Sequence, residues 1–254
     1  MNGVVNFLKP PGMTSHDAVA FVRRVAKIRR VGHTGTLDPA AAGVLPICIG
    51  QATRLVEYLQ SGNKEYIAEA TFGIETDTCD AVGEIVFQGD ASHVNLETLR
   101  AALDPFRGEI VQTPPLHSAI KIDGKKLYEL ARKGAENVQI PTREVTISQL
   151  LVTKFFHDVS THNARAMLKV ECSGGTYIRS LVRDIGRQLG CGATMTFLVR
   201  SRSGSFTIAD AKTPDEIERD LESCLIPIVE ILGCFAEKTV TDDNAIANLS
   251  QGKQ

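Results

Sequence analysis

Apolar and polar residues alternate in several stretches of this chain, which predicts strands. In KEYIAEATFG at 64–73, the side chains of Tyr66, Ala68, Ala70 and Phe72 fall on one side, as in a strand with one buried face. REVTISQLLVTKFF and ARAMLKVEC have the same character, and we expect them to be neighbours in a sheet. The predicted strands are 3–9, 44–50, 64–73, 143–156, 164–172 and 195–206.

A period of three to four residues predicts helices between these strands. Ser15 is a suitable N-cap for a helix that runs through Lys27, and GGTYIRSLVRDIGRQLG predicts a helix from near Thr176 to Gly190. Further helices are expected over 51–60, over 95–106, and after a turn at Asp123-Gly124. Because helices and strands mix without regular βαβ units, we expect an α+β fold with a mixed, largely antiparallel sheet flanked by helices and loops.

Composition and charge narrow the class of protein. The 254 residues are 43% hydrophobic and 23% charged, which is enough apolar material for a globular core. No apolar run reaches the length of a membrane span, so we expect a cytoplasmic protein with no membrane partner. Residues 1–60 and 165–202 are basic, whereas 61–106 and 203–254 are acidic. Folding could gather the basic segments into a polyanion-binding face, or the pattern could be ordinary surface variation.

Motifs for common cofactors are missing from the sequence. The six cysteines form no CxxC pair, which favours reduced, mostly buried thiols over a zinc or redox site. No GxGxxG or P-loop pattern occurs, and no second histidine lies at ligand spacing from His33. We therefore expect neither a cofactor nor a metal.

A single acid, Asp38, stands in the stretch RRVGHTGTLDPAAAGVLPICIG at 29–50. An Asp before proline is common in turns, where its carboxylate accepts hydrogen bonds from nearby N–H groups. In this stretch Gly32 and Gly35 permit a tight backbone before the acid, and Pro39 stiffens the chain after it. A nucleophile needs such rigid support, so Asp38 is the main candidate for one.

Three arginines share one face of the helix predicted after GGTY. Arg179, Arg183 and Arg187 are spaced four residues apart, and they could form a solvated basic stripe. Alternatively, Arg179 reaches inward to pair with a carboxylate, which keeps that acid ionised and oriented, while the other two bind phosphate.

Two more side chains have both a structural and a functional interpretation. Tyr66 lies on the apolar side of its strand, where it is either a core residue or a ring that stacks on a planar base and offers its hydroxyl for proton transfer. His33 is either a turn histidine or a wedge that fills a gap in a nucleic-acid stack.

Five blocks of the sequence resemble, in the same order, blocks of the TruB family of bacterial tRNA pseudouridine-55 synthases. They are GVVNFLKPPGMTSHD, GHTGTLDPAAAGVLPICIGQATR, KEYIAEATFGIETDTCDAVG, TPPLHSAIKIDGKKLYELARKG and CSGGTYIRSLVRDIGRQLG, and they cover most of residues 3–202. The resemblance implies an isomerase that converts uridine 55 in the T arm of tRNA to pseudouridine.

The resemblance also implies roles at the matching positions. Asp38 in GTLDP corresponds to the catalytic aspartate and Tyr66 to the tyrosine that stacks on the target uracil. Arg179 in GTYIR corresponds to the arginine that pairs with the aspartate, and His33 in GHTG to the histidine that enters the T loop when the base flips. The remaining substrate-binding candidates are Leu198, which lines the pocket, and Lys9, which supports the site.

Domains and partners follow from the same resemblance. Residues 1–238 are expected to form the catalytic domain, with an insertion at about 113–143 that contacts the RNA. Residues 239–254 are similar to the opening of a C-terminal, PUA-like RNA-binding domain that the chain does not complete. The implied partner is the T-arm stem-loop of tRNA, without a guide RNA, and the expected state is a monomer.

The reaction itself needs few groups. It breaks the N1–C1′ bond, turns the uracil and rejoins it through C5, so one carboxylate nucleophile is sufficient. Two alternatives are an RNA-binding or RNA-folding module without turnover and a guide-RNA-dependent synthase of the dyskerin type. The intact Asp38, Tyr66 and Arg179 argue against the first, and the insertion argues against the second.

Overall fold

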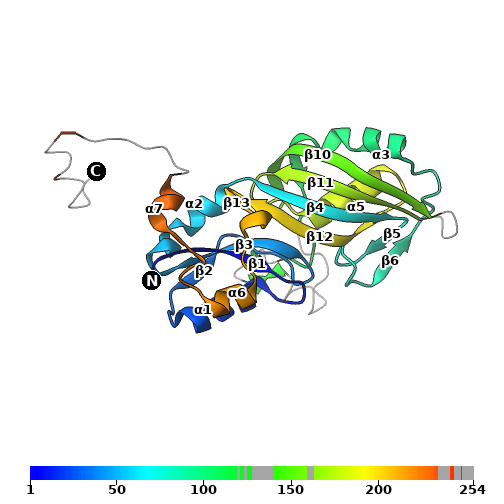
Figure 1. Cartoon of the computed structure of the whole chain (residues 1–254). Helices are drawn as coiled ribbons and strands as arrows, with labels where there is room; N and C mark the ends of the chain where they lie inside the picture. Colours follow the sequence, from blue (N-terminus) through cyan, green and yellow to red (C-terminus); the bar gives the residue numbers. More distant parts are fainter. Residues whose placement is uncertain are drawn as a thin grey trace.

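A large mixed sheet organises the molecule, as seen in Figure 1. The computed structural model describes residues 1–118, 121–122, 125–127, 140–158, 163–233, 241–242 and 247. The strands are β1 (Gly3–Lys9), β2 (Val31–His33), β3 (Ala42–Ile49), β4 (Lys64–Phe72), β5 (Ile74–Thr76), β6 (Ile85–Gln88), β7 (Gly108–Gln112), β8 (Lys121–Ile122), β9 (Lys125–Lys126), β10 (Arg143–Asp158), β11 (Asn163–Cys172), β12 (Ala193–Ser203), β13 (Phe206–Thr207) and β14 (Leu225–Pro227). The α-helices are α1 (Ser15–Ala26), α2 (Val56–Ser61), α3 (Leu96–Ala102), α5 (Ile178–Gln188), α6 (Pro214–Arg219) and α7 (Ile228–Leu232), and the 3₁₀ turns are η1 (Gly50–Leu55), η2 (Asp104–Phe106) and η3 (Ile208–Asp210).

The sheet has the strand order β14-β1-β3-β12-β4-β11-β10-β7, and β2 and β13 pair with β3 and β12. Its described pairs are antiparallel except β3 with β12, which is parallel and joins the two halves of the sheet. At this seam Gly43 lies opposite Arg200 and has φ +114°. Any Cβ at Gly43 would overlap the backbone of Arg200, so only glycine fits. The α+β fold with a largely antiparallel sheet is thus confirmed.

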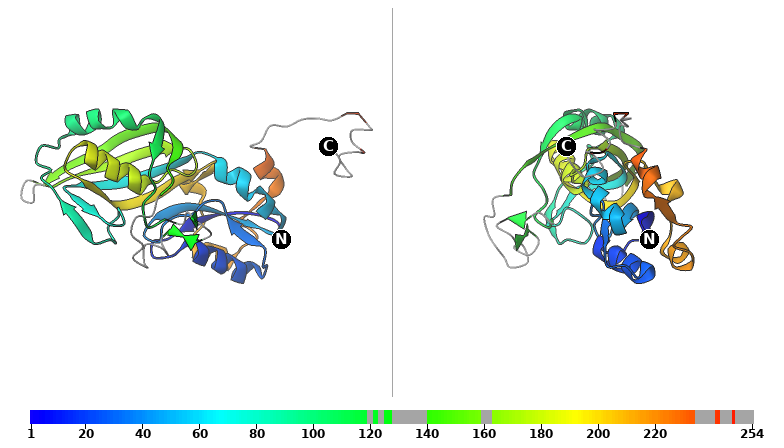
Figure 2. Two further views of the ribbon diagram at one scale, coloured as in Figure 1. Left: turned by 180° about the vertical axis from the view of Figure 1, so that it is seen from behind. Right: turned by 90° about the vertical axis from the view of Figure 1, so that its left-hand side faces the viewer.

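Helix α5 covers the sheet by burying one apolar stripe. From α5, the side chains of Ile178, Leu181, Val182 and Ile185 are buried in the main core cluster. Figure 2 shows α5 in front of the strands when the molecule is seen from behind. The predicted apolar side of β4 is confirmed as well, since Tyr66, Ala68, Ala70 and Phe72 are all buried. Helices α1 and α6 lie beside β1 and β3, at the end of the sheet away from α3 (Figure 1).

Element boundaries differ from the sequence predictions at three helix starts. Thr14, not Ser15, caps α1, because Thr14 and Asp17 form a reciprocal capping box. Helix α5 begins at Ile178 rather than near Thr176. The helix predicted over 51–60 is split into η1 and α2. The helix predicted over 95–106 is present as α3, capped by Asn95, and is followed by η2, and the pairing of β10 with β11 is confirmed.

The structure can be compared with three more sequence predictions: buried thiols, the lack of a membrane span, and the segments after residue 122. Five of the six cysteines are free and buried, as expected, and Cys234 lies outside the described residues. No helix in the described part of the chain is both long and apolar enough to cross a membrane. The turn at Asp123-Gly124, most of the basic helix predicted after it and most of 239–254 also lie outside the described residues.

Candidate active site

The loop that carries Asp38 connects β2 to β3 and is held from two sides. Ser15, at the start of α1, accepts a hydrogen bond from Leu37 N (2.8 Å) and donates one to Leu37 O (3.0 Å). The ammonium of Lys9 donates to Pro39 O at 3.2 Å, and Gly12 N donates to the same carbonyl at 2.9 Å. Because the residues on both sides of Asp38 are fixed, its carboxylate projects from a rigid turn, as a nucleophile requires.

Arg179 pairs with Asp38 across 141 positions of sequence. Its NH2 donates to Oδ1 at 3.1 Å, and its Nε lies 2.9 Å from Oδ2. The Nε–H is not directed at an acceptor, so the ion pair consists of one charge-assisted hydrogen bond and one close contact between opposite charges without a hydrogen bond. The Arg179 side chain is 6% exposed and that of Asp38 34%, so the arginine approaches from inside the protein and leaves the carboxylate open to solvent. The pairing of Arg179 with an acid, expected from sequence, is present.

Other protein groups fix the orientation of the Arg179 guanidinium. NH1 donates to Thr78 O at 3.0 Å, and NH2 donates to His117 O at 3.1 Å. A second carboxylate oxygen, Asp80 Oδ2, lies 3.5 Å from NH1. Arg179 therefore keeps acceptors of its own when Asp38 is engaged with a substrate. The sequence reasoning did not identify Asp80, because its proximity to Arg179 depends entirely on folding.

Three buried cations surround the Asp38 loop, and the sequence reasoning missed two of them. Arg200 is 1% exposed and donates from Nε to Val44 O (2.7 Å) and from NH2 to Gly35 O (3.2 Å). Lys64 donates to two backbone carbonyls, and Lys9 to three. None of the three forms an ion pair with a described residue within 4.0 Å. Side chains two residues apart in a strand share a face, so on β12 Arg200 lies on the same face as the apolar Leu198. This spacing was a signal in the sequence that could have revealed the inward position of Arg200.

Burial has a clear effect on the two lysines. It lowers the pKa of Lys9 to about 8, with the nearby Asp38 carboxylate acting in the opposite direction. Burial likewise lowers the pKa of Lys64 to about 8, and the positive charge of Arg200 adds to that effect. At neutral pH both lysines are mostly protonated, so the surroundings of Asp38 favour negative charge.

Tyr66 and Leu198 lie on adjacent strands beside this cluster. Tyr66 is opposite Arg200 in the β4–β12 register, and Leu198 is opposite Ala68. The two side chains are 6% and 8% exposed, so only a small part of each can be reached from solvent. Burial raises the pKa of the Tyr66 phenol, while the charge and hydrogen bond of Arg200 oppose the rise. The phenol is therefore neutral at physiological pH, and the buried position suits both a core residue and the floor of a site.

His33 ends β2 and is half-buried. Its Nδ1 accepts a hydrogen bond from Gly35 N at 3.2 Å, which places the proton of the neutral ring on Nε2. Burial is the main cause that lowers its pKa, so the neutral form predominates at pH 7. A neutral ring with an available Nε2–H suits insertion among bases better than a charged one would.

The other two arginines of the predicted basic face are engaged within the protein. Arg183 Nε donates to Asp184 at 2.8 Å, and its NH2 donates to Thr113 O at 3.1 Å. Arg187 binds both carboxylate oxygens of Glu75, the closer at 2.8 Å. Since each charge is matched by a carboxylate, the structure weakens the expectation that these two side chains bind phosphate.

The arrangement has the parts for nucleophilic chemistry on a group that leaves as an anion. It holds one accessible carboxylate, an arginine that orients it and a cationic interior beside a neutral phenol. Within the described ranges no group of three or more His, Cys, Asp and Glu side chains is placed to hold a metal ion.

Comparison with known proteins gives the family. The model of the TruB family pseudouridylate synthase N-terminal domain matches residues 23–178, and that of the tRNA pseudouridylate synthase B C-terminal domain matches 179–236. The tRNA pseudouridine synthase B of Symbiobacterium thermophilum is 49% identical over 95% of this chain and 79% of the relative. That of Clostridioides difficile is 44% identical over 99% of this chain and 83% of the relative.

Solved structures agree with this assignment. A chain in the crystal structure of a Cbf5-Nop10-Gar1 complex superposes with a TM-score of 0.72 at 29% identity, over 98% of this chain and 67% of the other. A chain of an H/ACA RNP bound to a substrate RNA superposes with a TM-score of 0.62 at 29% identity, over 85% of this chain and 52% of the other. The Asp38 loop, the arginine paired with it and the two consecutive family matches all lie in one chain, which belongs to the TruB family of pseudouridine synthases.

Proposed function

We propose that the protein converts uridine 55 in the T arm of tRNA to pseudouridine, with Asp38 as the nucleophile. The observation that carries the proposal is the ion pair between Arg179 and Asp38, at the end of a loop held by Ser15 and Lys9. The names of the similar proteins, tRNA pseudouridine synthase B in several bacteria, support tRNA as the substrate.

The chemistry follows from the charges around Asp38. The N1–C1′ bond of the uridine breaks, the uracil turns, and a new bond forms between C5 and C1′; C5 then loses its proton and N1 takes one up, so the product is an isomer of the substrate. The carboxylate of Asp38, oriented by Arg179, attacks as nucleophile, as in retaining glycoside cleavage. Its target is C1′ or the base, or it assists elimination, and the three routes have the same overall atom balance. The protonated Lys9, Lys64 and Arg200 stabilise the negative charge that develops on the departing uracil.

Access to the base requires flipping. A uridine stacked in a folded T arm cannot reach a carboxylate at the end of a loop, and extruding it costs a few kcal/mol. In the proposed complex the ring of Tyr66 stacks on the uracil, Leu198 lines the pocket and His33 occupies the space that the base leaves. Because Tyr66 is 6% exposed, stacking requires that a group covering its ring moves aside.

The proposed domain arrangement and partners follow the same relationship. Residues 1–238 form the catalytic domain, and the family match ending at 236 supports this boundary. The RNA-contacting insertion at about 113–143 falls largely outside the described residues. Tight binding to tRNA could also assist its folding, and we propose that the protein acts as a cytoplasmic monomer without a guide RNA.

One assay tests the proposal against its alternatives. Purified protein is incubated with an unmodified T-arm hairpin and no guide RNA, and pseudouridine is mapped at each uridine. We expect modification at the uridine equivalent to position 55 and at no other. Product formed only after a guide RNA is added would indicate the dyskerin type, and binding without product would indicate a non-catalytic RNA-binding module.

A further inference from the structure

Four arginines surround one surface pocket at the far end of β2 from His33. Arg23 comes from α1, Arg29 and Arg30 from the turn before β2, and Arg54 from η1. The pocket has a volume of about 650 Å³, and we refer to these four side chains as the arginine pocket. They come from three separate elements of the chain, so the pocket is formed by folding and not by a single basic run.

Neutral acceptors orient two of these guanidinium groups. Arg30 Nε donates to Thr53 Oγ1 at 2.6 Å, and Arg23 NH2 donates to Val31 O at 3.0 Å. Each guanidinium has five N–H donors, so most remain available. The hydrogen bonds therefore fix the geometry without neutralising the charge.

The arginine pocket is also short of counter-charge. None of its four side chains forms an ion pair within 4.0 Å with any residue in the described part of the chain. Glu57 is the one acidic residue among those that line the pocket, so four positive charges face one negative charge. Guanidinium groups with free donors and excess positive charge are suited to phosphate groups.

The backbone beneath the pocket is held in place. Gly50 begins η1 at φ +62° and donates from its N–H to Arg30 O at 2.8 Å. A Cβ at Gly50 would overlap the side chain of Asn2 and approach Met1 O to 2.6 Å. Since glycine alone fits there, the carbonyl of Arg30 and the start of η1 keep a fixed relation beneath the pocket.

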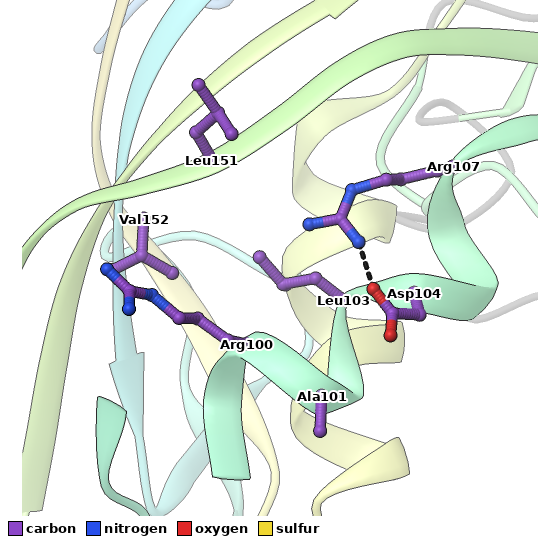
Figure 3. Close-up of a pocket in the computed structure, with 7 residues that line it drawn as sticks. All are labelled: Arg100, Ala101, Leu103, Asp104, Arg107, Leu151 and Val152. Carbon is purple, nitrogen blue, oxygen red and sulfur yellow. Dashed lines mark hydrogen bonds and ion pairs between the residues drawn. The ribbon is translucent and has the colours of Figure 1, made fainter. Parts of the chain in front are cut away.

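A second pocket contrasts with this one. It has a volume of about 440 Å³ and lies between α3, η2 and β10 (Figure 3). Two of its side chains are also arginines, but Arg107 is paired with Asp104 and donates to Leu150 O. Apolar Leu103, Leu151 and Val152 form much of the remaining lining, so phosphate would find little free positive charge there.

We propose that the arginine pocket binds the phosphodiester backbone of the RNA whose base enters the Asp38 site. This rests on the proposed function. Strand β2 links the two places, since His33 is three positions after Arg30 and a strand rises about 3.3 Å per residue, which gives roughly 10 Å. The backbone gripped in the pocket therefore lies within a few nucleotides of the flipped base.

The test removes two charges and compares the result with the removal of two charges elsewhere. The variant is Arg29→Gln/Arg30→Gln, and the matched control is Arg100→Gln/Arg219→Gln, which changes exposed arginines on α3 and α6. Dissociation constants for an unmodified tRNA transcript are measured from 50 to 200 mM salt. Single-turnover rates are measured at saturating protein, and melting temperatures are recorded for every variant.

We expect the pocket variant to bind about fivefold more weakly or worse, and the dependence of log K on log salt to flatten by roughly 0.7–0.9 for each phosphate that the variant no longer binds. Its saturating rate should match the wild type, because Asp38 and Arg179 are untouched. An Arg29→Lys/Arg30→Lys variant should recover most of the affinity, which separates charge from structural damage. The control should show wild-type affinity and salt dependence.

Two failures are distinguishable. If the wild type makes pseudouridine but the pocket variant keeps the affinity and salt dependence of the control, the pocket does not bind RNA. If the wild type makes no pseudouridine in tRNA, the proposed function itself fails, whatever the variants do. A pocket variant with weaker affinity but the wild-type salt dependence would also overturn the proposal, because phosphate contacts must release counterions.

Discussion

Changing Asp38 to Asn tests the assignment of the nucleophile most directly. The amide keeps the size of the side chain. Its oxygen can still accept a hydrogen bond from Arg179 NH2, which lies 3.1 Å from Asp38 Oδ1 in the wild type. Arg179 would retain its two backbone acceptors and Asp80 at 3.5 Å, so its charge would not be left alone. The substitution removes one charge–charge interaction with a carboxylate that is 34% exposed, worth about 1–2 kcal/mol after solvent screening.

The expected effect on turnover is much larger than the effect on stability. An amide is not a nucleophile, so we expect the single-turnover rate to fall by at least about 10³-fold, equivalent to roughly 4 kcal/mol. A decrease in stability of about 1–2 kcal/mol should lower the melting temperature by only a few degrees in a chain of this size, about 2–4 °C per kcal/mol. At 25 °C the variant therefore stays folded, and tRNA binding should remain within about threefold, since phosphate contacts are unchanged.

The structure offers a matched control in Asp80→Asn. Asp80 also faces Arg179, and its side chain is 16% exposed, so the same chemical change is made beside the same guanidinium. Its Oδ1 accepts from Thr78 Oγ1 at 2.6 Å, which an Asn can preserve. We expect a comparable decrease in stability and a rate within about tenfold of the wild type, or about 1.4 kcal/mol. The reasoning is refuted if Asp38→Asn retains more than a small fraction of the rate, or if the two variants lose activity equally.

Substitutions at three further positions probe the groups around Asp38. Tyr66→Phe should keep RNA affinity but lose about 10²–10⁴-fold in single-turnover rate if the hydroxyl moves a proton, and Tyr66→Leu should also lose about 1–3 kcal/mol of binding free energy. If Tyr66 is only a core residue, Tyr66→Phe should leave the rate unchanged and Tyr66→Leu should mainly lower the melting temperature. Arg200→Met removes the donors to Val44 O on β3 and Gly35 O in the Asp38 loop, and should cost about 2–4 kcal/mol in urea unfolding, with Arg200→Lys restoring part of it. Equal stability of Arg200→Met and wild type would contradict a role of Arg200 in holding the loop against β3. Folding lowers the pKa of Lys9 from its ordinary 10.5 to about 8. Between these two pH values the unfolded chain binds more protons than the folded protein, so the contribution of Lys9 to stability rises with pH in this range. In Lys9→Met this rise, at most about 1.4 kcal/mol per pH unit, should disappear from unfolding curves recorded between about pH 7.5 and 9; identical pH dependence in both proteins would show that Lys9 does not titrate in this window.

Local features of the chain were predictable because they depend on near neighbours. The alternation through 64–72 places side chains on opposite faces of a strand whatever the rest of the fold does, and the buried face of β4 matches it. The cap at Asn95 is similarly local. The α1 cap was misplaced by one residue, since Thr14 forms the capping box and Ser15 is instead used in a tertiary contact to Leu37. Competing partners for a hydroxyl cannot be ranked from sequence alone.

Charge pairing was decided by the tertiary structure. Arg179, Arg183 and Arg187 are equivalent in helical spacing, yet Arg183 pairs with the adjacent Asp184. Arg179 and Arg187 instead find carboxylates 141 and 112 residues away, because such interactions depend on which surfaces pack together. For the same reason, the order of residues along the chain does not show that Arg200 and Lys64 are buried or that the four arginines form a pocket. The sequence determined that a lone Asp38 sits in a stiff turn within five family-like blocks; only folding decided which cations surround it, because long-range electrostatic contacts are set by three-dimensional proximity and not by order along the chain.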